Sequence, residues 1–416
     1  MAFVDQDDAG AIKVSRKHFT LRVILFAVAI VAAIGGITYA IISATKLDPG
    51  VYTITASPDK ENPYNNQGVQ GSFYFGGSSG EVKALKNATT ELLNKELRAA
   101  SYRLDETKTY EISSSIGAVN AKIGEEVTVD ERVYAVLLDA YNKSKEDNNF
   151  SIFAAPLFDA WKDVLNDASH ENDPLRNATY ASYLEKLTGI IADQSNYDLL
   201  FLGEGKVKLT LSAAYQAFRT EYEITSPVIS LNSLHDAYLL KEVQSAFEKQ
   251  GFKDGVLFTL TGSLASIEPS HPTTYGALDK DAGKVLSYGA FDISKSAVVA
   301  SAIHFTQSES SYLYNPSYDI VKDGVTYHRS LYLNLGTGMP NNDIAASYIK
   351  RDGNDIVGAS LDLVSLEAKT FEETKASGKD GLLFTSWNES KKAYIASAAK
   401  SGFKLDETSH YSLTTI

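Results

Sequence analysis

The sequence predicts an α+β protein: one large globular region that follows a single N-terminal membrane anchor. Over residues 71–416, short runs rich in β-branched and aromatic residues alternate with longer segments whose apolar residues recur at helical spacing. The chain has 416 residues, 44% of them hydrophobic and 22% charged, which is the composition of a folded protein with a sizeable core. An apolar run, with Arg22 at its start as its one charged residue, occupies residues 21–43.

Charge and cysteine content exclude several classes of function. The formal net charge is −13 and no basic stripe follows residue 46, so a surface for nucleic acid or another polyanion is excluded. The sequence has no cysteine, which excludes disulfides, thiolate metal sites and a cysteine nucleophile. Any metal ion must therefore be held by oxygen or histidine ligands.

The apolar run at residues 21–43 predicts a transmembrane helix, because about 20 apolar residues span a bilayer core as a helix. Four basic residues precede or begin it and Asp48 follows it, so the positive-inside rule places residues 1–20 in the cytoplasm. The expected location is the cell membrane, with a single pass and an extracytoplasmic C-terminal domain. A cleaved signal peptide is the alternative, but no small-x-small cleavage site follows Ile42.

The elements behind the anchor follow in order. Residues 44–70 contain Pro58, Pro63 and several Asn and Gly, which predicts a linker, and the globular domain is expected over residues 71–416. Periodicity predicts helices at 81–100, 133–141, 234–249 and 388–399, and strands at 72–75, 206–211, 255–260 and 284–293.

Motifs that identify a reaction by chemistry alone are absent. The sequence has no P-loop and no HExxH zinc motif. Its seven histidines are scattered singly, and a lone histidine such as His235 or His328 is more often a surface or hydrogen-bonded core residue than a metal ligand.

Eight short segments are more informative together, because their order along the chain matches that of one enzyme family. They are Gly71-Ser72, Tyr110 to Ser114 with Asn120, Phe150 to Trp161 with its Ala-Pro-Leu, Ile229 to Tyr238, Thr261-Gly262-Ser263, Val299 to Ala302, Leu331 to Pro340 and Asn354 to Ala359. The chain thereby resembles the FAD:protein FMN transferase (ApbE-like) family, as a distant and degenerate member.

The resemblance implies a fold of mixed and antiparallel sheets with packed helices. Enzymes of this family use magnesium or another divalent metal to hydrolyse FAD, and they attach FMN through a phosphoester to a Ser or Thr of an extracytoplasmic protein. By position, the resemblance implies a metal ligand at Asp355. If the chain is active, its base is His328, three residues before the position of the family's histidine. The implied cofactor-binding residues are Gly71, Ser72, Tyr238, Gly262, Ser301 and Thr337.

Departures from the family pattern at five positions weigh against catalysis. Asp236 stands where the family has a lysine, and a carboxylate beside a phosphate costs about 1 to several kcal/mol of binding. Leu331 stands at the family's histidine, and loss of a positioned general base typically costs about 10²- to 10⁴-fold in rate. Ala359 replaces a threonine that would supply metal-binding oxygen, and Ser151 and Phe153 replace the Asp and Thr of an earlier motif.

Two hypotheses follow from these departures. In the first, the chain is a pseudoenzyme that acts as a binding or scaffold module, for example in flavin-based electron transfer at the cell surface, with an extracytoplasmic flavoprotein or membrane complex as its partner. In the second, it is an active magnesium-dependent FAD:protein FMN transferase. Its metal ligands are then Asp355 with Asp352 or Asp362, and its base is His328.

Overall fold

A computed structural model describes residues 46–57, 69–111, 114–281, 284–304 and 317–416 of the chain. It divides into two compact units, residues 1–49 with 76–84 and residues 50–75 with 85–416. The predicted membrane helix at residues 21–43 lies outside the described residues, as does the central part of the predicted linker. Within the described ranges, no helix is long and apolar enough to cross a membrane.

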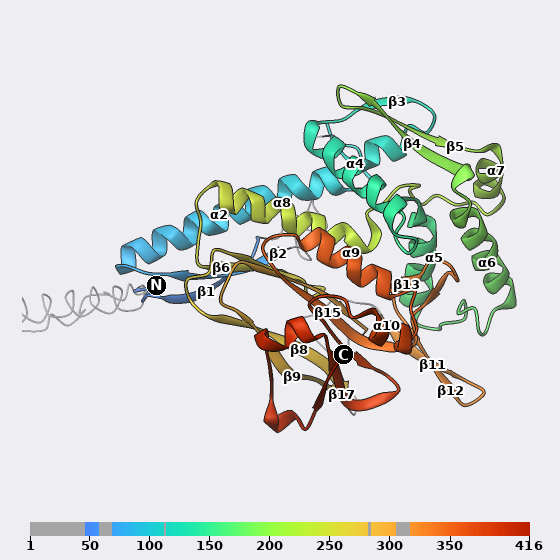
Figure 1. Ribbon diagram of the computed structural model, residues 1–416. Helices are drawn as coiled ribbons and strands as arrows, with labels where there is room; N and C mark the ends of the chain where they lie inside the picture. Colours follow the sequence, from blue (N-terminus) through green and yellow to red (C-terminus); the bar gives the residue numbers. More distant parts are fainter. Residues whose placement is uncertain (1–45, 58–68, 112–113, 282–283, 305–316) are drawn as a thin grey trace, which may run out of the picture. The chain divides into compact units, whose positions relative to one another are not determined.

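A nine-stranded sheet forms the centre of the second unit (Figure 1). Its neighbouring strands are antiparallel, apart from the last pair, which is parallel. In spatial order the strands are β1 (Gly50–Ile54), β2 (Val69–Phe75), β6 (Gly255–Thr259), β7 (Leu264–Ile267), β10 (Ala297–Ile303), β15 (Ile344–Asp352), β16 (Leu382–Ser386), β17 (Glu389–Ile395) and β19 (Ser412–Thr415).

Two helices cover one face of this sheet. Helix α8 (His235–Lys249) contacts β6 and β7, and α9 (Ile356–Leu366) contacts β10 and β15 (Figure 1). Their buried positions follow helical spacing, as in Leu239, Val243 and Phe247 of α8. Because α8 and α9 also contact each other, the start of α8 lies near the middle strands of the sheet.

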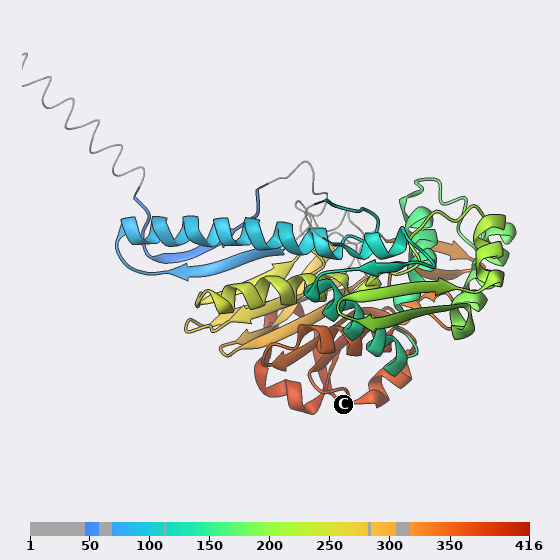
Figure 2. The ribbon, with the colours of Figure 1, turned by 90° about the horizontal axis from the view of Figure 1, so that it is seen from above.

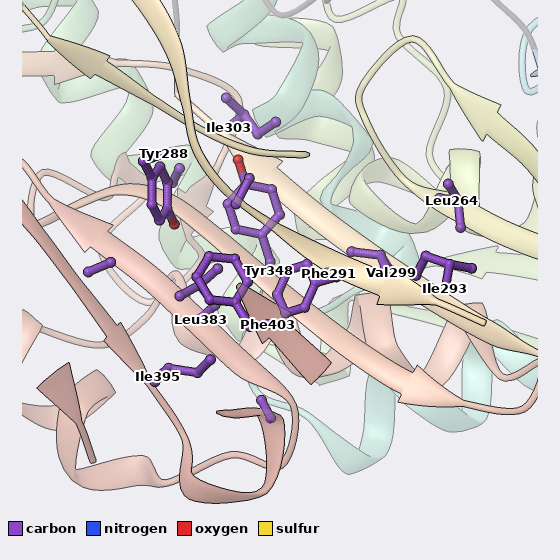
Figure 3. Close-up of a cluster of buried hydrophobic side chains, with 14 of the residues drawn as sticks. Leu264, Tyr288, Phe291, Ile293, Val299, Ile303, Tyr348, Leu383, Ile395 and Phe403 are labelled. Atoms are coloured by element: carbon purple, nitrogen blue, oxygen red, sulfur yellow. The ribbon is translucent and has the colours of Figure 1, made fainter. Parts of the chain in front are cut away.

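A small sheet covers the opposite face and encloses the main core. It consists of β8 (Thr273–Asp281), β9 (Lys284–Ile293) and β18 (Phe403–Leu405). Figure 3 shows Tyr288, Phe291 and Phe403 packed near Tyr348 and Leu383 of the large sheet. Each such fully buried side chain contributes about 1.5–3 kcal/mol of hydrophobic stabilisation, and the Tyr348 hydroxyl is satisfied by donating to the Leu278 carbonyl.

Between β2 and α8 the chain adds helices and a second three-stranded sheet, of order β3–β5–β4 (Figure 2). Helix α4 packs on it through the edge-to-face pair of Tyr134 and Phe201. The added elements are α2 (Ser79–Leu104), which begins in the first unit, α3 (Ile116–Asn120), β3 (Glu126–Thr128), α4 (Glu131–Glu146), α5 (Ala155–Asn166), α6 (Ala178–Ala192), β4 (Tyr197–Gly203), β5 (Lys206–Leu211) and α7 (Ala213–Glu221).

Two hairpins and a short helix complete the second unit. The hairpin of β11 (Tyr318–Lys322) and β12 (Val325–Arg329) precedes that of β13 (Leu333–Asn334) and β14 (Met339–Pro340). Helix α10 (Phe371–Ser377) starts with a capping box, in which Thr370 and Glu373 exchange side-chain-to-backbone hydrogen bonds.

The α+β prediction is confirmed, and most predicted elements are found within a few residues of their expected bounds. The strands at 206–211 and 284–293 are β5 and β9, and the helix expected at 234–249 is α8. Part of the expected linker, Gly50–Ile54, forms β1 and pairs with β2, so the sheet starts before residue 71.

The helix predicted over 388–399 is wrong. Glu389–Ile395 is strand β17, which pairs with β16 on one side and β19 on the other. Its last three residues are buried, while its first four alternate between partly and fully exposed. Two lysines and four alanines gave residues 388–399 a helical composition, but backbone pairing on both sides overrides such weak propensity.

Candidate functional site

A cavity of about 330 Å³ lies in the second unit, between α5, α8 and α9 and the middle strands of the large sheet. Its walls also include the turn between β6 and β7 and the segment between β12 and β13. The residues that line the cavity include Glu106, Lys162, His235, Asp236, Thr261, Ser301, Leu331, Tyr332, Ser360 and Glu367.

Asp236 enters the cavity from the first turn of α8. A short 3₁₀ turn, Asn232–Leu234, precedes the helix, and a carboxylate in a first helical turn is favoured by the helix dipole. The Thr261 hydroxyl, from the β6–β7 turn, donates to one Asp236 oxygen, and His235 Nδ1 lies 3.4 Å from the other. The Asp236 carboxylate is thus fixed against the sheet and its neighbouring histidine.

His235 and Glu106 form the second polar group of the cavity. Burial opposes protonation of His235, but its hydrogen bond to Asp236 and the charges of Glu106 and Asp236 outweigh burial and raise its pKa above the usual value. Burial raises the pKa of Glu106, although the Leu231 N–H donates to its Oε1 over 2.7 Å. Protonated His235 is therefore stabilised by two carboxyl groups.

Glu367 and His304 form a third, fully buried group. Their side chains are 3% and 1% exposed, and Glu367 Oε2 lies 3.6 Å from His304 Nε2. Neither atom makes a hydrogen bond with the described part of the chain. The His304 ring stacks on Tyr332, with ring centroids 4.5 Å apart. Tyr332 and Glu367 line the cavity, whereas His304 does not.

The remaining wall is mostly apolar. Leu331 occupies it beside Tyr332, and Leu239, Leu260, Leu363 and Val364 extend it. The one lysine in the wall, Lys162, already pairs with Asp159 at 2.9 Å. Three carboxyl groups therefore face one lysine and one histidine, and both of these cations have a carboxylate partner.

This residue set does not fit the diphosphate of FAD, because phosphate oxygens placed near Asp236 and Glu106 would meet like charge rather than a free cation. The implied Mg²⁺ site does not fit either. Asp355 is exposed and accepts the Gly358 N–H as the N-cap of α9, and Asp362 is paired with Arg351 and Lys379. No group of three or more His, Asp or Glu side chains suitable for a metal occurs among the described residues.

The glycine-rich run forms the hairpin turn between β13 and β14. Asn334 Oδ1 accepts the N–H groups of Gly336 and Thr337, and Gly338 adopts a positive φ of 68°. Trp161 Nε1 donates to the Gly338 carbonyl over 2.7 Å, which ties the turn to α5. Leu335 and Gly336 line a second, more open pocket of about 800 Å³ instead of the cavity.

The structure brings only some of the predicted site residues to the cavity. Ser301 lines it and donates to the Thr261 carbonyl. Gly262 lies in the adjoining turn with a φ of 100°, where an added Cβ would meet Ser301 Oγ at 2.8 Å. Ser360 lines the cavity while its neighbour Ala359 is fully buried, as expected for successive residues of a helix.

The other predicted site residues lie elsewhere. Gly71 and Ser72 are paired within β2, and Tyr238 is buried with its hydroxyl donating to Asp139. Thr337 is in the exposed turn of the β13–β14 hairpin. His328 lies on β12, where Nδ1 is 2.7 Å from Asp319 Oδ1 and the ring stacks on Trp387. Asp352 pairs with Lys350 on the surface.

Sequence reasoning did not single out Glu106, Lys162, His304 or Glu367 as site residues. They come from four distant segments, and each stands alone in its local sequence without a motif. The apolar run before His304 and the helical spacing before Glu367 predict burial of these segments, but not that the two side chains meet.

Solved structures share this architecture. The ApbE protein from Thermotoga maritima MSB8 superposes with a TM-score of 0.53 and 15% identity, over 80% of this chain and 96% of its own. The flavin transferase ApbE from Vibrio cholerae gives a TM-score of 0.53 and 13% identity, over 85% of this chain and 99% of its own. The chain has the fold of the ApbE flavin transferases.

Similarity at this level establishes the ApbE fold alone. Neither a family model nor a curated protein sequence matches the chain. The residues of the cavity, rather than the fold, must therefore carry any inference about activity.

Proposed function

We propose that this chain is a membrane-anchored, extracytoplasmic binding module that keeps the ApbE fold and has lost FMN transfer. The observation that carries the proposal is the lining of the cavity. Asp236 and Leu331 both face it, at the positions where the resemblance places a lysine and a histidine.

Each replacement removes one requirement of the reaction. A transferase must neutralise the FAD diphosphate, and Asp236 adds negative charge where that neutralisation is needed. It must also take a proton from the acceptor hydroxyl, and the Leu331 side chain has no atom that accepts a proton. His328 does not compensate, because it lies on the β11–β12 hairpin beside Asp319 and Trp387 and does not line the cavity.

The resemblance further suggests the setting in which such a module acts. A partner of the proposed module is an extracytoplasmic flavoprotein or a membrane complex of flavin-based electron transfer. The predicted anchor at residues 21–43 would hold the module at the same membrane surface.

A flavin-transfer assay tests the proposal. The full-length chain in detergent is incubated with FAD, Mg²⁺ and a protein carrying a flavin-acceptor threonine, with an active ApbE enzyme as the positive control. We expect no covalent fluorescent band from this chain. A robust band that is lost with Asp355→Ala would overturn the proposal and establish an active transferase.

A gain-of-binding variant tests the same argument in the opposite direction. Asp236→Lys should tighten FAD binding by about tenfold or more, because it replaces repulsion by attraction. Asp380→Lys, the same charge reversal at an exposed position, serves as the control. Equal affinity of the Asp236→Lys and Asp380→Lys variants, measured by quenching of flavin fluorescence, would show that Asp236 does not oppose phosphate.

A further inference from the structure

The carboxyl groups of the cavity suit a positively charged ligand, whereas the diphosphate of FAD is negatively charged. We propose that it binds a small organic cation, a protonated primary amine with an apolar body, whose ammonium group donates to Glu367. This inference rests on the proposed function, because it assigns to the cavity a ligand other than the flavin dinucleotide.

Glu367 provides the first argument. Its side chain is 3% exposed, it lines the cavity, and its Oε2 accepts no hydrogen bond from the described part of the chain. A buried carboxylate oxygen left without a donor is energetically unfavourable, so native structures rarely retain one without a ligand, ion or water. His304 Nε2, 3.6 Å away, is too distant to satisfy it by a good hydrogen bond.

The charge balance of the cavity provides the second argument. The Lys162 ammonium is paired with Asp159, and His235 is paired with Asp236. Glu106 and Glu367 therefore have only histidines, His235 and His304, beside them, and no lysine or arginine of the described residues forms an ion pair with either carboxyl group. An ammonium group supplies the missing positive charge and up to three N–H donors.

The shape of the cavity provides the third argument. Its apolar wall of Leu239, Leu260, Leu331, Leu363 and Val364 suits a hydrocarbon body, and Tyr332 offers an aromatic face. A volume of about 330 Å³ is near the lower end of the ~300–1,000 Å³ range of small-molecule sites. The ligand is therefore a small amine and not a dinucleotide.

Three probes that share a phenyl ring with a two-carbon chain and differ in the charge of the end group test the proposal. Phenethylamine is cationic, phenethyl alcohol is neutral and hydrocinnamate is anionic at neutral pH. Their binding to the full-length chain in detergent is measured by calorimetry and by the rise in unfolding temperature. We expect binding of the amine, with the alcohol weaker by tenfold or more and the anion undetectable. Equal binding of all three, or no binding of the amine, would overturn the proposal.

Variants locate the binding in the cavity. Glu367→Gln keeps the size of the side chain and removes its charge, so amine affinity should fall about 10- to 100-fold. Glu125→Gln makes the same change at an exposed position and should leave affinity unchanged. Leu331→Trp fills the cavity without altering its charge and should abolish binding. If Glu367→Gln does not fold, the Leu331→Trp variant serves as the test. Amine binding that is unaffected by Leu331→Trp would contradict the proposal.

The two proposals fail separately. Flavin transfer by the wild-type chain overturns the proposed function whatever the amine does. Absence of both flavin transfer and amine binding overturns only the assignment of a cationic ligand.

Discussion

His235 is the side chain whose protonation the cavity controls most directly. Burial alone would keep the imidazole neutral, yet Asp236 and Glu106 reverse that effect and raise its pKa. A raised folded pKa means that His235 contributes stability that is fully present below its unfolded pKa of about 6.5. That contribution is lost as the pH rises through the higher folded pKa.

Asp236→Asn should therefore lower the pKa of His235 and make the stability of the protein less dependent on pH. The wild type should exceed the variant in unfolding free energy by more at acidic pH than at alkaline pH. Urea unfolding across the pH range checks this, and NMR titration of the His235 imidazole protons reports the pKa directly. Asp380→Asn, at an exposed site, is the control; a constant stability difference at every pH would contradict the argument.

At the scale of elements, a buried ion pair joins the β11–β12 hairpin to the segment before α6. Arg329 Nε donates to Asp173 Oδ2 over 2.9 Å, both side chains are almost fully buried, and Tyr318 donates to the same oxygen. Arg329→Met should cost about 3–5 kcal/mol of unfolding free energy, because it leaves the Asp173 charge buried without its cation. Urea unfolding measures this loss.

The exposed pair of Lys253 and Glu268, 2.8 Å apart, provides the control for that variant. Lys253→Met should cost only about 0–1 kcal/mol, because water screens the charges. The double variant Arg329→Met with Asp173→Leu should recover part of the loss, since it leaves no unpaired buried charge. Equal losses of unfolding free energy in Arg329→Met and Lys253→Met would show that the buried ion pair stabilises the protein no more than the exposed one.

The β13–β14 turn supplies a second test at this scale. An alanine at Gly338 would have an unfavourable positive φ, which costs about 1–2 kcal/mol, and its Cβ would clash with Thr188 Oγ1. Gly338→Ala should thus lower the unfolding temperature clearly, while Gly336→Ala should change it little. At Gly336 no positive φ occurs and the nearest atom to an added Cβ is Asn334 Oδ1 at 3.2 Å. Similar decreases in unfolding temperature for both variants would show that the positive φ of Gly338 and its contact with Thr188 are not the cause of the destabilisation.

The same elements show which features of the structure can be predicted from the sequence and which cannot. The turn glycines, Trp161 and the start of α8 were predictable, because each has a local signal: a glycine pattern, an aromatic anchor or an amphipathic period. Strand β17 was not, because its partners β16 and β19 provide the decisive hydrogen bonds from other parts of the chain. The pairing of His304 with Glu367 was not predictable for the same reason: it exists only after β10 and α9 have packed.

For the molecule as a whole, the structure separates what the fold requires from what the reaction requires. The Trp161 bond to the Gly338 carbonyl and the turn itself are retained, and both serve packing. The positions facing the cavity, Asp236 and Leu331, carry the chemical departures. Under the proposed function, the first set maintains the fold, and the second set accounts for the expected loss of diphosphate binding.

The predicted single-pass topology of the whole chain can be tested directly, because the sequence has no cysteine. Ala9→Cys places one thiol before the predicted anchor at residues 21–43, and Lys122→Cys places one on an exposed site of the folded unit. A maleimide that does not cross membranes should label the Lys122→Cys variant in intact cells and the Ala9→Cys variant only after permeabilisation. Both variants should sediment with membranes, because the apolar run is long enough to span a bilayer. Labelling of Ala9→Cys in intact cells, or release of the chain into the soluble fraction, would contradict the predicted topology.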